Sequence, residues 1–365
     1  MERPPDSMHI PDGYLSPATC AALYAGAAPF WWVALRRVTR KIGTRLIPLV
    51  SVFAAFSFVV MMFNLPLPGG TTGHAVGVGI AAIVLGPWAS MLAISTALAI
   101  QAVFFGDGGI TALGANCFNM AIVGSLVAYA SYRLLAGRSA LDSRRRALAA
   151  GIAGYLAINA SALLAAVEFG IQPIFFKDSS GAPLYAPYPL RIAIPAMMAG
   201  HLTLAGMAEF IVSAGLVAWL QRSHTSLLAA TAPEAEALNA PDGAPGWRGI
   251  RPLLAIVAIL AVLTPLGILA VGTAWGEWSP SDFSDPAARR AIAAASGNAD
   301  LPSQIPHGLA RLSSLWTAPF PDYAPAFLRS ASFGYILSCA FGIGVILLAA
   351  LVLTWASALF RRRVL

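Results

Sequence analysis

Apolar blocks of about 20 residues run through the chain, and no other feature restricts its fold as strongly. This is the length that a helix needs to cross the hydrocarbon core of a membrane. The apolar residues run continuously, whereas the strands of a membrane barrel alternate. Charged residues make up only 11% of the chain, against about a quarter in a soluble domain. The sequence therefore predicts an all-α, polytopic bundle of transmembrane helices.

We expect about nine spans, seven in one block and two near the C-terminus. The third and fourth are the weakest and predict short, tilted helices divided at Gly86-Pro87, because the residue before a proline resists helix. The nine predicted spans cover residues 18–36, 46–64, 74–87, 88–105, 112–134, 147–169, 190–220, 252–274 and 333–360.

The polar joints divide the chain into three parts. Residues 1–222 form the seven-helix membrane block, and residues 223–250 form a cytoplasmic linker. Residues 251–365 form a two-helix region around a long, proline-rich outer loop at 275–332. No internal repeat is visible, so the inverted-repeat design of many transporters is not supported.

Arginine and lysine orient the spans. Most of these residues lie in four segments, 36–45, 133–146, 222–251 and 361–363, and nine spans place all four on one side. The positive-inside rule makes that side cytoplasmic. We therefore expect a plasma-membrane protein with its N-terminus outside and its C-terminus in the cytoplasm. The net charge of +7 is then explained without a nucleic-acid partner.

Two of only five histidines draw attention. His9 lies in Met-His-Ile-Pro-Asp-Gly-Tyr-Leu-Ser-Pro, and His74 lies in Gly-Gly-Thr-Thr-Gly-His-Ala-Val-Gly. The predicted topology places both on the outer side, and imidazole is the commonest metal ligand. A histidine at a loop–helix junction is also often merely solvated or capped. The residues alone therefore leave both interpretations open.

A chain that began at Met8 would offer a strong chelate. Its α-amine, the next amide nitrogen and Nδ1 of His9 can form fused rings on one metal ion, and His74 can supply a fourth nitrogen. Four nitrogens in a plane suit Ni(II) or Cu(II) and tolerate Co(II). Binding releases protons, so affinity should fall at low pH. Asp12 is a candidate hydrogen-bond partner of an imidazole. The metal is cargo here, and we expect no permanently bound cofactor.

Other polar residues lie within the apolar blocks. His201 and Glu209 are eight residues apart and share a helix face, so they either line an ion path or fix the packing of neighbouring helices. Asn116 is a candidate for hydrogen bonds across helices. The chain has neither a G-x-x-x-x-G-K-[ST] phosphate loop nor an H-E-x-x-H motif, so we expect neither ATP hydrolysis nor zinc-protease activity.

Four motifs in order resemble the CbiM/NikM family, the substrate-binding membrane components of energy-coupling-factor transporters for cobalt and nickel. They span residues 8–220, and residues 250–365 are similar to an accessory subunit that some members carry as a C-terminal fusion. The four motifs are the Met8–Pro17 segment, Gly73-His74 with Gly86-Pro87-Trp88, the Gly106–Asn116 segment and the Gly200–Glu209 segment.

This resemblance implies a divalent metal held by the N-terminal methionine amine and two histidines, roles that map onto Met8, His9 and His74. It also implies a transmembrane coupling subunit and two cytoplasmic ATPases as partners, and a supply of metal for cobalamin or nickel-enzyme synthesis. The chain departs from the family in the seven residues before Met8. A misassigned start, which we favour, proteolytic trimming, or a variant site built on His9 and His74 would each account for them.

The sequence thus predicts the metal-capture subunit of an ATP-driven cobalt or nickel importer. The alternative is a solitary permease driven by the ion gradient. A membrane metalloenzyme would need a catalytic base beside the metal, and Asp12 is the one candidate in the outer motifs. A signalling or scaffold subunit would bind no metal at all.

Overall fold

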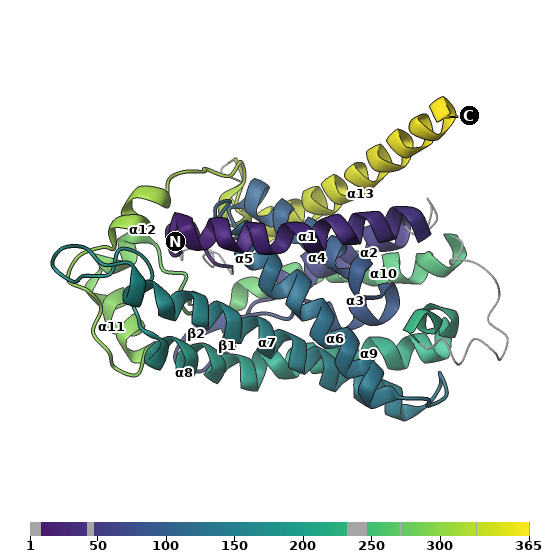
Figure 1. Cartoon of the computed structure of the whole chain (residues 1–365), viewed down its shortest axis with the longest axis horizontal. Coiled ribbons are helices and arrows are strands. Elements are labelled where there is room, and N and C mark those ends of the chain that lie inside the picture. The colour runs from purple at the N-terminus through teal and green to yellow at the C-terminus, as the bar shows by residue number, and fades with distance from the viewer. Residues whose placement is uncertain (1–8, 42–46, 232–246, 271, 326, 365) are drawn as a thin grey trace.

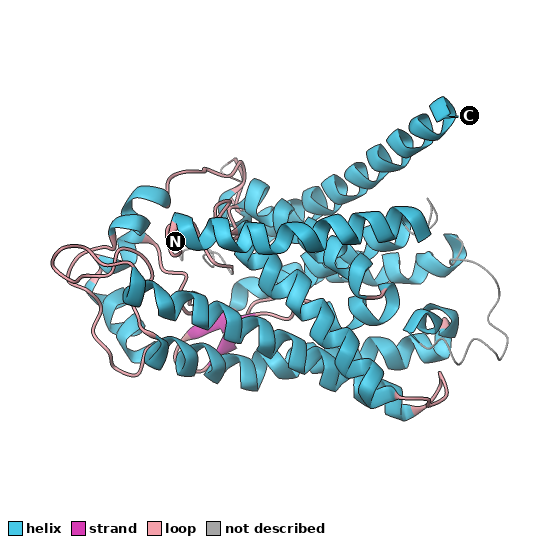
Figure 2. Cartoon of the chain, viewed as in Figure 1, coloured by secondary structure: helices cyan, strands magenta, loops and turns pink. Residues whose placement is uncertain are grey.

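Long helices that run side by side account for most of the computed structural model (Figures 1 and 2), which describes residues 9–41, 47–231, 247–270, 272–325 and 327–364. The α-helices, long and short, are in chain order α1 (Pro17–Lys41), α2 (Ile47–Met61), α3 (Val78–Leu85), α4 (Pro87–Ile100), α5 (Leu113–Asn116), α6 (Gly124–Ala136), α7 (Arg144–Phe175), α8 (Leu190–Gly200), α9 (Gly206–Ser223), α10 (Trp247–Leu263), α11 (Pro286–Ala295), α12 (His307–Leu312) and α13 (Ala331–Val364).

Short segments of other geometry connect or extend these helices. One antiparallel hairpin, β1 (Leu65–Leu67) with β2 (Thr71–Gly73), pairs Leu65 with Gly73. In the part of the chain that the structure describes, π-helical segments interrupt long helices at Cys117–Val123 and His201–Ala205, and another, Gln101–Phe105, ends the helix that begins as α4. Within the described residues, 3₁₀ segments lie at Thr225–Thr231, Thr264–Leu269, Pro280–Phe283 and Pro321–Tyr323.

The predicted all-α membrane bundle is confirmed. Among the residues described, seven helices are long and apolar enough to cross a membrane. They are Pro17–Thr39, Pro87–Phe105, Leu113–Ala136, Arg144–Phe175, Leu190–Ser223, Ile250–Leu269 and Ala331–Val352. A shorter apolar helix, α2, adds 15 residues.

The predicted count of nine spans is not confirmed, and α3 shows why. It holds eight residues, or about 12 Å of helix, so it cannot cross a core of about 30 Å. Gly77 and Gly86 limit it at each end with φ of 73° and 75°, a conformation that glycine adopts without the Cβ penalty. The expected break at Gly86-Pro87 is present, with Pro87 at the start of α4. Every residue of α3 is buried inside the bundle.

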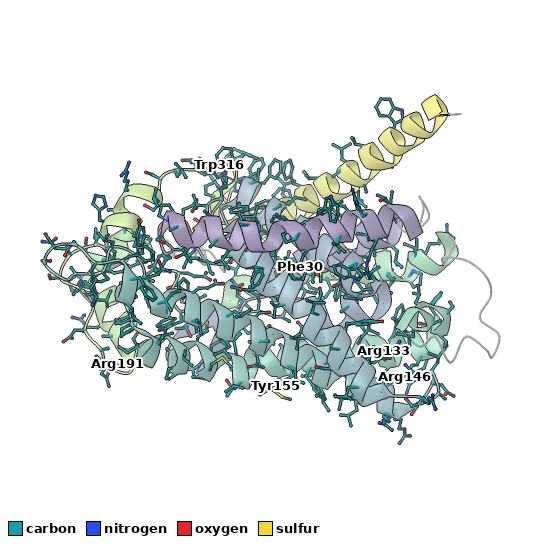
Figure 3. All side chains as sticks on the ribbon, in the orientation of Figure 1. Phe30, Arg133, Arg146, Tyr155, Arg191 and Trp316 are labelled. Atoms are coloured by element: carbon teal, nitrogen blue, oxygen red, sulfur yellow. The ribbon has the colours of Figure 1, made fainter. Side chains whose placement is uncertain are left out.

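Most of the long loops lie at one end of the bundle. The loops between α7 and α8 and between α10 and α13, including α11 and α12, gather at the end where the chain begins (Figure 1). Arg133 and Arg146 lie at the opposite end, whereas Arg191 lies at the loop-rich end (Figure 3). Arg146 is buried there and donates to the carbonyl oxygens of Ser139 and Ala140.

The C-terminal helices pack on the outside of the first block. α10 and α13 both contact α2, and the far half of α13 projects away from the bundle (Figure 1). The segment between them crosses to the loop-rich end, where Thr72 of β2 donates its N–H to the carbonyl oxygen of Thr273 at 3.2 Å. The two parts of the chain therefore meet at the end that also contains His9.

Candidate metal centre

His9 and His74 meet in the structure, although 64 residues separate them in the sequence. Their ring centroids lie 5.1 Å apart with an angle of 63° between the planes. Both side chains are buried, and both line a cavity of about 90 Å³ at the loop-rich end of the bundle. A water molecule needs roughly 10–15 Å³ of such space, so the cavity has room for a hydrated ion or several waters. The two histidines singled out in the sequence thus face one chamber.

Asn116 holds the chain next to His9. Its Oδ1 accepts the N–H of Ile10 at 3.1 Å, and its Nδ2 donates to the carbonyl oxygen of Ile10 at 3.1 Å. The N–H of Gly109 donates to the same carbonyl at 2.9 Å. The side-chain amide therefore pairs with Ile10 as a neighbouring strand would, and this fixes the backbone that carries His9.

Asp12 lies close to the site but contacts a loop and not an imidazole. Its carboxylate accepts the N–H of Ile110 at 3.1 Å and the N–H and hydroxyl of Thr111, the former at 2.8 Å. A Cβ at Gly109 would lie 2.3 Å from the amide nitrogen of Asp12, so glycine is required for this approach. The carboxylate expected beside an imidazole thus binds the 106–111 loop to the N-terminal turn.

The carboxylate that contacts His9 is Asp107. Nδ1 of His9 lies 2.9 Å from Oδ1 of Asp107. A carboxylate oxygen accepts, so Nδ1 carries the proton and the lone pair of the neutral ring lies on Nε2. Metal-binding histidines usually have such a second partner, which orients the ring and increases its basicity as a ligand.

This contact bears on the predicted chelate. Fused rings with the α-amine and amide nitrogens use Nδ1 of His9, and here Nδ1 faces Asp107. A half-turn of the ring about Cβ–Cγ would release Nδ1 from Asp107. Met8, the expected source of the amine, lies outside the described residues, as do the seven residues before it.

His74 follows β2, and its loop is held by Glu209. Oε2 of Glu209 accepts the N–H of Val76 at 2.7 Å and of Gly77 at 2.8 Å, and Oε1 accepts the N–H of Gly79 at 3.0 Å. The carboxylate thus binds the first amides of α3, where unpaired N–H groups favour an anion. Of the two roles considered for Glu209, these contacts favour packing, because it does not line the cavity.

The tautomer of His74 follows from a short local contact. Its Nδ1 lies 3.0 Å from the carbonyl oxygen of Ala75. Because a carbonyl can only accept, Nδ1 carries the proton and Nε2 carries the lone pair. A backbone carbonyl is one of the usual second partners of metal-binding histidines.

His201 lines the cavity together with groups that can bind a metal or water. Its Nδ1 donates to the carbonyl oxygen of Met197 at 2.9 Å, and Met197 lines the same cavity. Asn119 is also in the wall, and its Nδ2 donates to Oε2 of Glu168 at 2.9 Å. The wall thus combines imidazole, thioether and amide groups, and the position of His201 fits the ion-path role of the two considered for it.

Residues of the C-terminal region line part of the cavity. Ala274, Trp275 and Glu277 lie in its wall. The Trp275 ring stacks on Tyr188 at 6.0 Å, and the hydroxyl of Tyr14 donates to the carbonyl oxygen of Trp278 at 2.7 Å. Sequence reasoning placed the 275–332 loop on the same side but did not connect it with the histidines.

Asp107, Glu277 and Tyr323 are polar residues near the site to which the sequence analysis gave no role. Asp107 lies within the quoted Gly106–Asn116 motif, and an acidic residue beside an apolar span is a functional candidate by default. The sequence alone could therefore have identified Asp107 as a candidate. Within the described residues, no group of three His, Cys, Asp or Glu side chains is arranged to hold a metal.

Comparison with known families agrees with this architecture. Residues 9–227 match the model of the "Cobalt uptake substrate-specific transmembrane region", and residues 251–359 match the model of the PDGLE domain. A solved structure described as a truncated transition metal transporter matches with a TM-score of 0.56 and 47% identity, covering 60% of this chain and all of its own.

Two curated relatives align over nearly the whole chain. The fused nickel transport protein NikMN of Rhodobacter capsulatus is 57% identical over 93% of this chain and 95% of its own length. The probable fused nickel transport protein LarMN of Lactiplantibacillus plantarum is 42% identical over 93% of this chain and 96% of its own. Both relatives thus resemble the two joined parts of this chain and not one of them alone.

Proposed function

Because the chain belongs to the cobalt-uptake substrate-specific transmembrane family and carries a C-terminal PDGLE domain, we propose that it captures cobalt or nickel for an ATP-driven importer of the energy-coupling-factor type. It is a multi-pass membrane protein of a metal-transport family and not an enzyme. The observation that supports capture most directly is the meeting of His9 and His74 in the wall of one cavity.

The proposed ligand set is the Met8 amine, the amide and imidazole nitrogens of His9, and the imidazole of His74. Four nitrogens suit Ni(II) and also accept Co(II). His74 fits this cargo as it stands, since the carbonyl oxygen of Ala75 accepts from its Nδ1 and leaves Nε2 for the metal. His9 would first turn its ring, so that Nδ1 leaves Asp107 and becomes a ligand. This set predicts that the ligand amine is free only in a chain that begins at Met8.

We place this site on the outer face of the plasma membrane. The basic segments that the positive-inside rule assigns to the cytoplasm include Arg133 and Arg146, which lie at the opposite end of the bundle (Figure 3). A transmembrane coupling subunit and two cytoplasmic ATPases would then drive the rearrangement that releases the metal inward, where it would serve cobalamin or nickel-enzyme synthesis.

A solitary permease is less well supported. It would need charged groups along the whole path, and the candidates in the spans are His201 and Glu209. The three backbone N–H groups that bind the Glu209 carboxylate commit it to the start of α3. Glu209 therefore stabilises the start of α3, whereas a permease would need its carboxylate to be accessible to the ion.

Equilibrium binding of Ni(II) and Co(II) to two purified forms, one starting at Met1 and one at Met8, tests the ligand set. We expect tight binding by the Met8 form alone, because an amide nitrogen at Met8 cannot replace the amine. Equal affinity of the two forms would show that the amine is not a ligand. Absence of binding by both would overturn the metal-capture proposal itself.

Uptake into liposomes tests the energy source. The chain is reconstituted with its coupling and ATPase partners, and metal uptake is measured with ATP and with a non-hydrolysable analogue. We expect uptake with ATP only. Equal uptake by the chain alone, driven by an ion gradient, would favour the permease instead.

A further inference from the structure

The histidine cavity contains a second set of polar groups that the proposed ligand set does not use. His201 and Asn119 both line this cavity, and each lies in a π-helical segment, His201–Ala205 or Cys117–Val123. Short π segments within longer helices are frequent at functional sites. Two such segments, from different membrane-spanning helices, thus place an imidazole and an amide in the wall of one chamber.

Asn119 is held in a way that leaves its amide oxygen for another partner. Its Nδ2 donates to Oε2 of Glu168 at 2.9 Å, and its backbone carbonyl oxygen accepts the hydroxyl of Ser161 at 2.8 Å. Asn119 is 2% exposed, and among the described residues its Oδ1 has no hydrogen-bond partner. A buried acceptor without a donor costs free energy, which a cation or a bound water would recover.

The ring of His201 is oriented by the helix that carries it. Its Nδ1 donates to the carbonyl oxygen of Met197 at 2.9 Å, so Nε2 carries the lone pair. A backbone carbonyl that fixes the ring through its other nitrogen is typical of metal-binding histidines. The backbone N–H of His201 donates to the same carbonyl, so the helix keeps a hydrogen bond there when the ring is replaced.

The two π segments lie next to the site of His74 but within the spans. β1 contacts the segment His201–Ala205, and β2, which directly precedes His74, contacts α8. His9 and His74 lie in loops, whereas Asn119 and His201 lie within helices long enough to cross the membrane. An ion that leaves the two loop histidines toward the membrane therefore stays in the same cavity when it reaches these groups.

From this arrangement we infer that His201 and Asn119 form a second binding position for a divalent transition-metal ion, which the cargo occupies after it leaves His9 and His74. The inference rests on the proposed function and deepens it. One imidazole nitrogen and one amide oxygen leave the other coordination positions to water, a set that accepts Ni(II) and Co(II). Such a position binds more weakly than four nitrogens, and an ion in transit needs weak binding because it must also leave.

The test removes the first position in the full chain and measures what remains. We expect weak Ni(II) binding by isothermal titration in the double variant His9→Ala, His74→Ala. Adding His201→Phe, which keeps a ring and removes both nitrogens, should weaken this binding by at least about tenfold, because even the loss of a group that only orients a ligand costs that much. Thr203→Val is the matched control in the same π segment. The Thr203 hydroxyl donates to a helix carbonyl, and the residue does not line the cavity, so we expect no change.

A second pair of variants keeps the inference testable if His201→Phe folds poorly. Asn119→Leu in the same double variant should also weaken the remaining Ni(II) binding. Its control is Asn159→Leu, which replaces another buried amide whose Oδ1 has no partner among the described residues. Asn159 lies outside the cavity wall, so its replacement should leave the affinity unchanged.

His201→Phe alone separates a second position from a shared one. The tight Ni(II) affinity should stay close to wild type, because the first position is intact, whereas ATP-driven uptake into liposomes should slow. A loss of tight affinity as large as in His74→Ala would show that His201 belongs to the first position and would overturn the inference. No Ni(II) binding in the double variant, or equal effects of His201→Phe and Thr203→Val, would overturn it as well. The proposed function fails separately, since in that case the wild-type chain itself would bind no Ni(II).

Discussion

At the scale of single residues, the proposed metal site depends on two buried histidines, His9 and His74. Histidine is rare in this chain, and the positions of the basic residues place His9 and His74 on one side. The structure brings their rings to 5.1 Å. The contact of His9 with Asp107 depends on how two distant parts of the chain pack, and no local pattern encodes it.

The role of His74 leads to a first prediction. His74→Ala should weaken Ni(II) affinity by more than about 100-fold, because losing a ligand costs more than losing a partner behind one. The fold should remain, since Glu209 holds this loop through backbone N–H groups. Isothermal titration with Ni(II) and a thermal unfolding scan measure the two effects.

His307→Ala is the control for this substitution. His307 begins α12 and is exposed, so its removal tests the effect of losing a histidine outside the cavity. We expect wild-type affinity. A similar loss of affinity in both variants would mean that His74 is not a specific ligand.

At the scale of elements, periodicity and glycine–proline signals located most helices, but they could not give the length of α3. The apolar run at 74–87 continues through residues that the structure divides between an extended loop and a buried helix of eight residues. Gly77 limits the helix because its φ of 73° is not helical. The position requires glycine, since an added Cβ would also lie 2.7 Å from the Phe56 ring. Whether an apolar run spans a membrane or ends inside a bundle depends on such tertiary contacts.

The carboxylate at the start of α3 leads to the prediction for this scale. Glu209→Gln replaces one accepting oxygen with an amide that donates, so it meets a backbone N–H that also donates. We expect a loss of roughly 2 kcal/mol in unfolding free energy and a lower Ni(II) affinity, because the His74 loop loses its anchor. Thermal unfolding in detergent and Ni(II) titration are the measurements.

Glu168→Gln makes the same change in another buried helix and is the matched control. Its partner, Nδ2 of Asn119, donates to one oxygen, and the glutamine carbonyl can still accept that hydrogen bond. We expect a much smaller effect on stability and affinity. Equal effects of the two substitutions would show that the three N–H contacts of Glu209 have no special importance.

At the scale of the whole molecule, the sequence separated a larger N-terminal block from a C-terminal region but not the way they combine. The long loop expected at 275–332 contains α11 and α12, and its residues Trp275 and Glu277 line the histidine cavity. This docking uses close backbone approaches. The N–H of Gly308 donates to the carbonyl oxygen of Leu184 at 2.6 Å, and such a contact follows from no pattern within either region.

Gly13 tests whether this docking supports metal binding. Its φ is 91°, and an added Cβ would lie 2.7 Å from the carbonyl oxygen of Gly308 and 2.8 Å from Cα of Leu309. Both are backbone atoms, so Gly13→Ala must displace α12 from the N-terminal turn. We expect weaker Ni(II) binding and faster proteolysis within 275–332, because the displaced loop no longer packs against the N-terminal turn and the cavity wall at Trp275 and Glu277 loosens.

Gly181→Ala separates that effect from backbone strain. Gly181 has φ of 86°, but nothing lies within 4 Å of an added Cβ, so the substitution carries a similar conformational cost of about 1–2 kcal/mol without a clash. It should leave Ni(II) affinity and the proteolysis rate close to wild type. If Gly13→Ala behaved like Gly181→Ala in both assays, the contact between the two regions would be dispensable for binding, and the C-terminal region would have to act at a later step of transport.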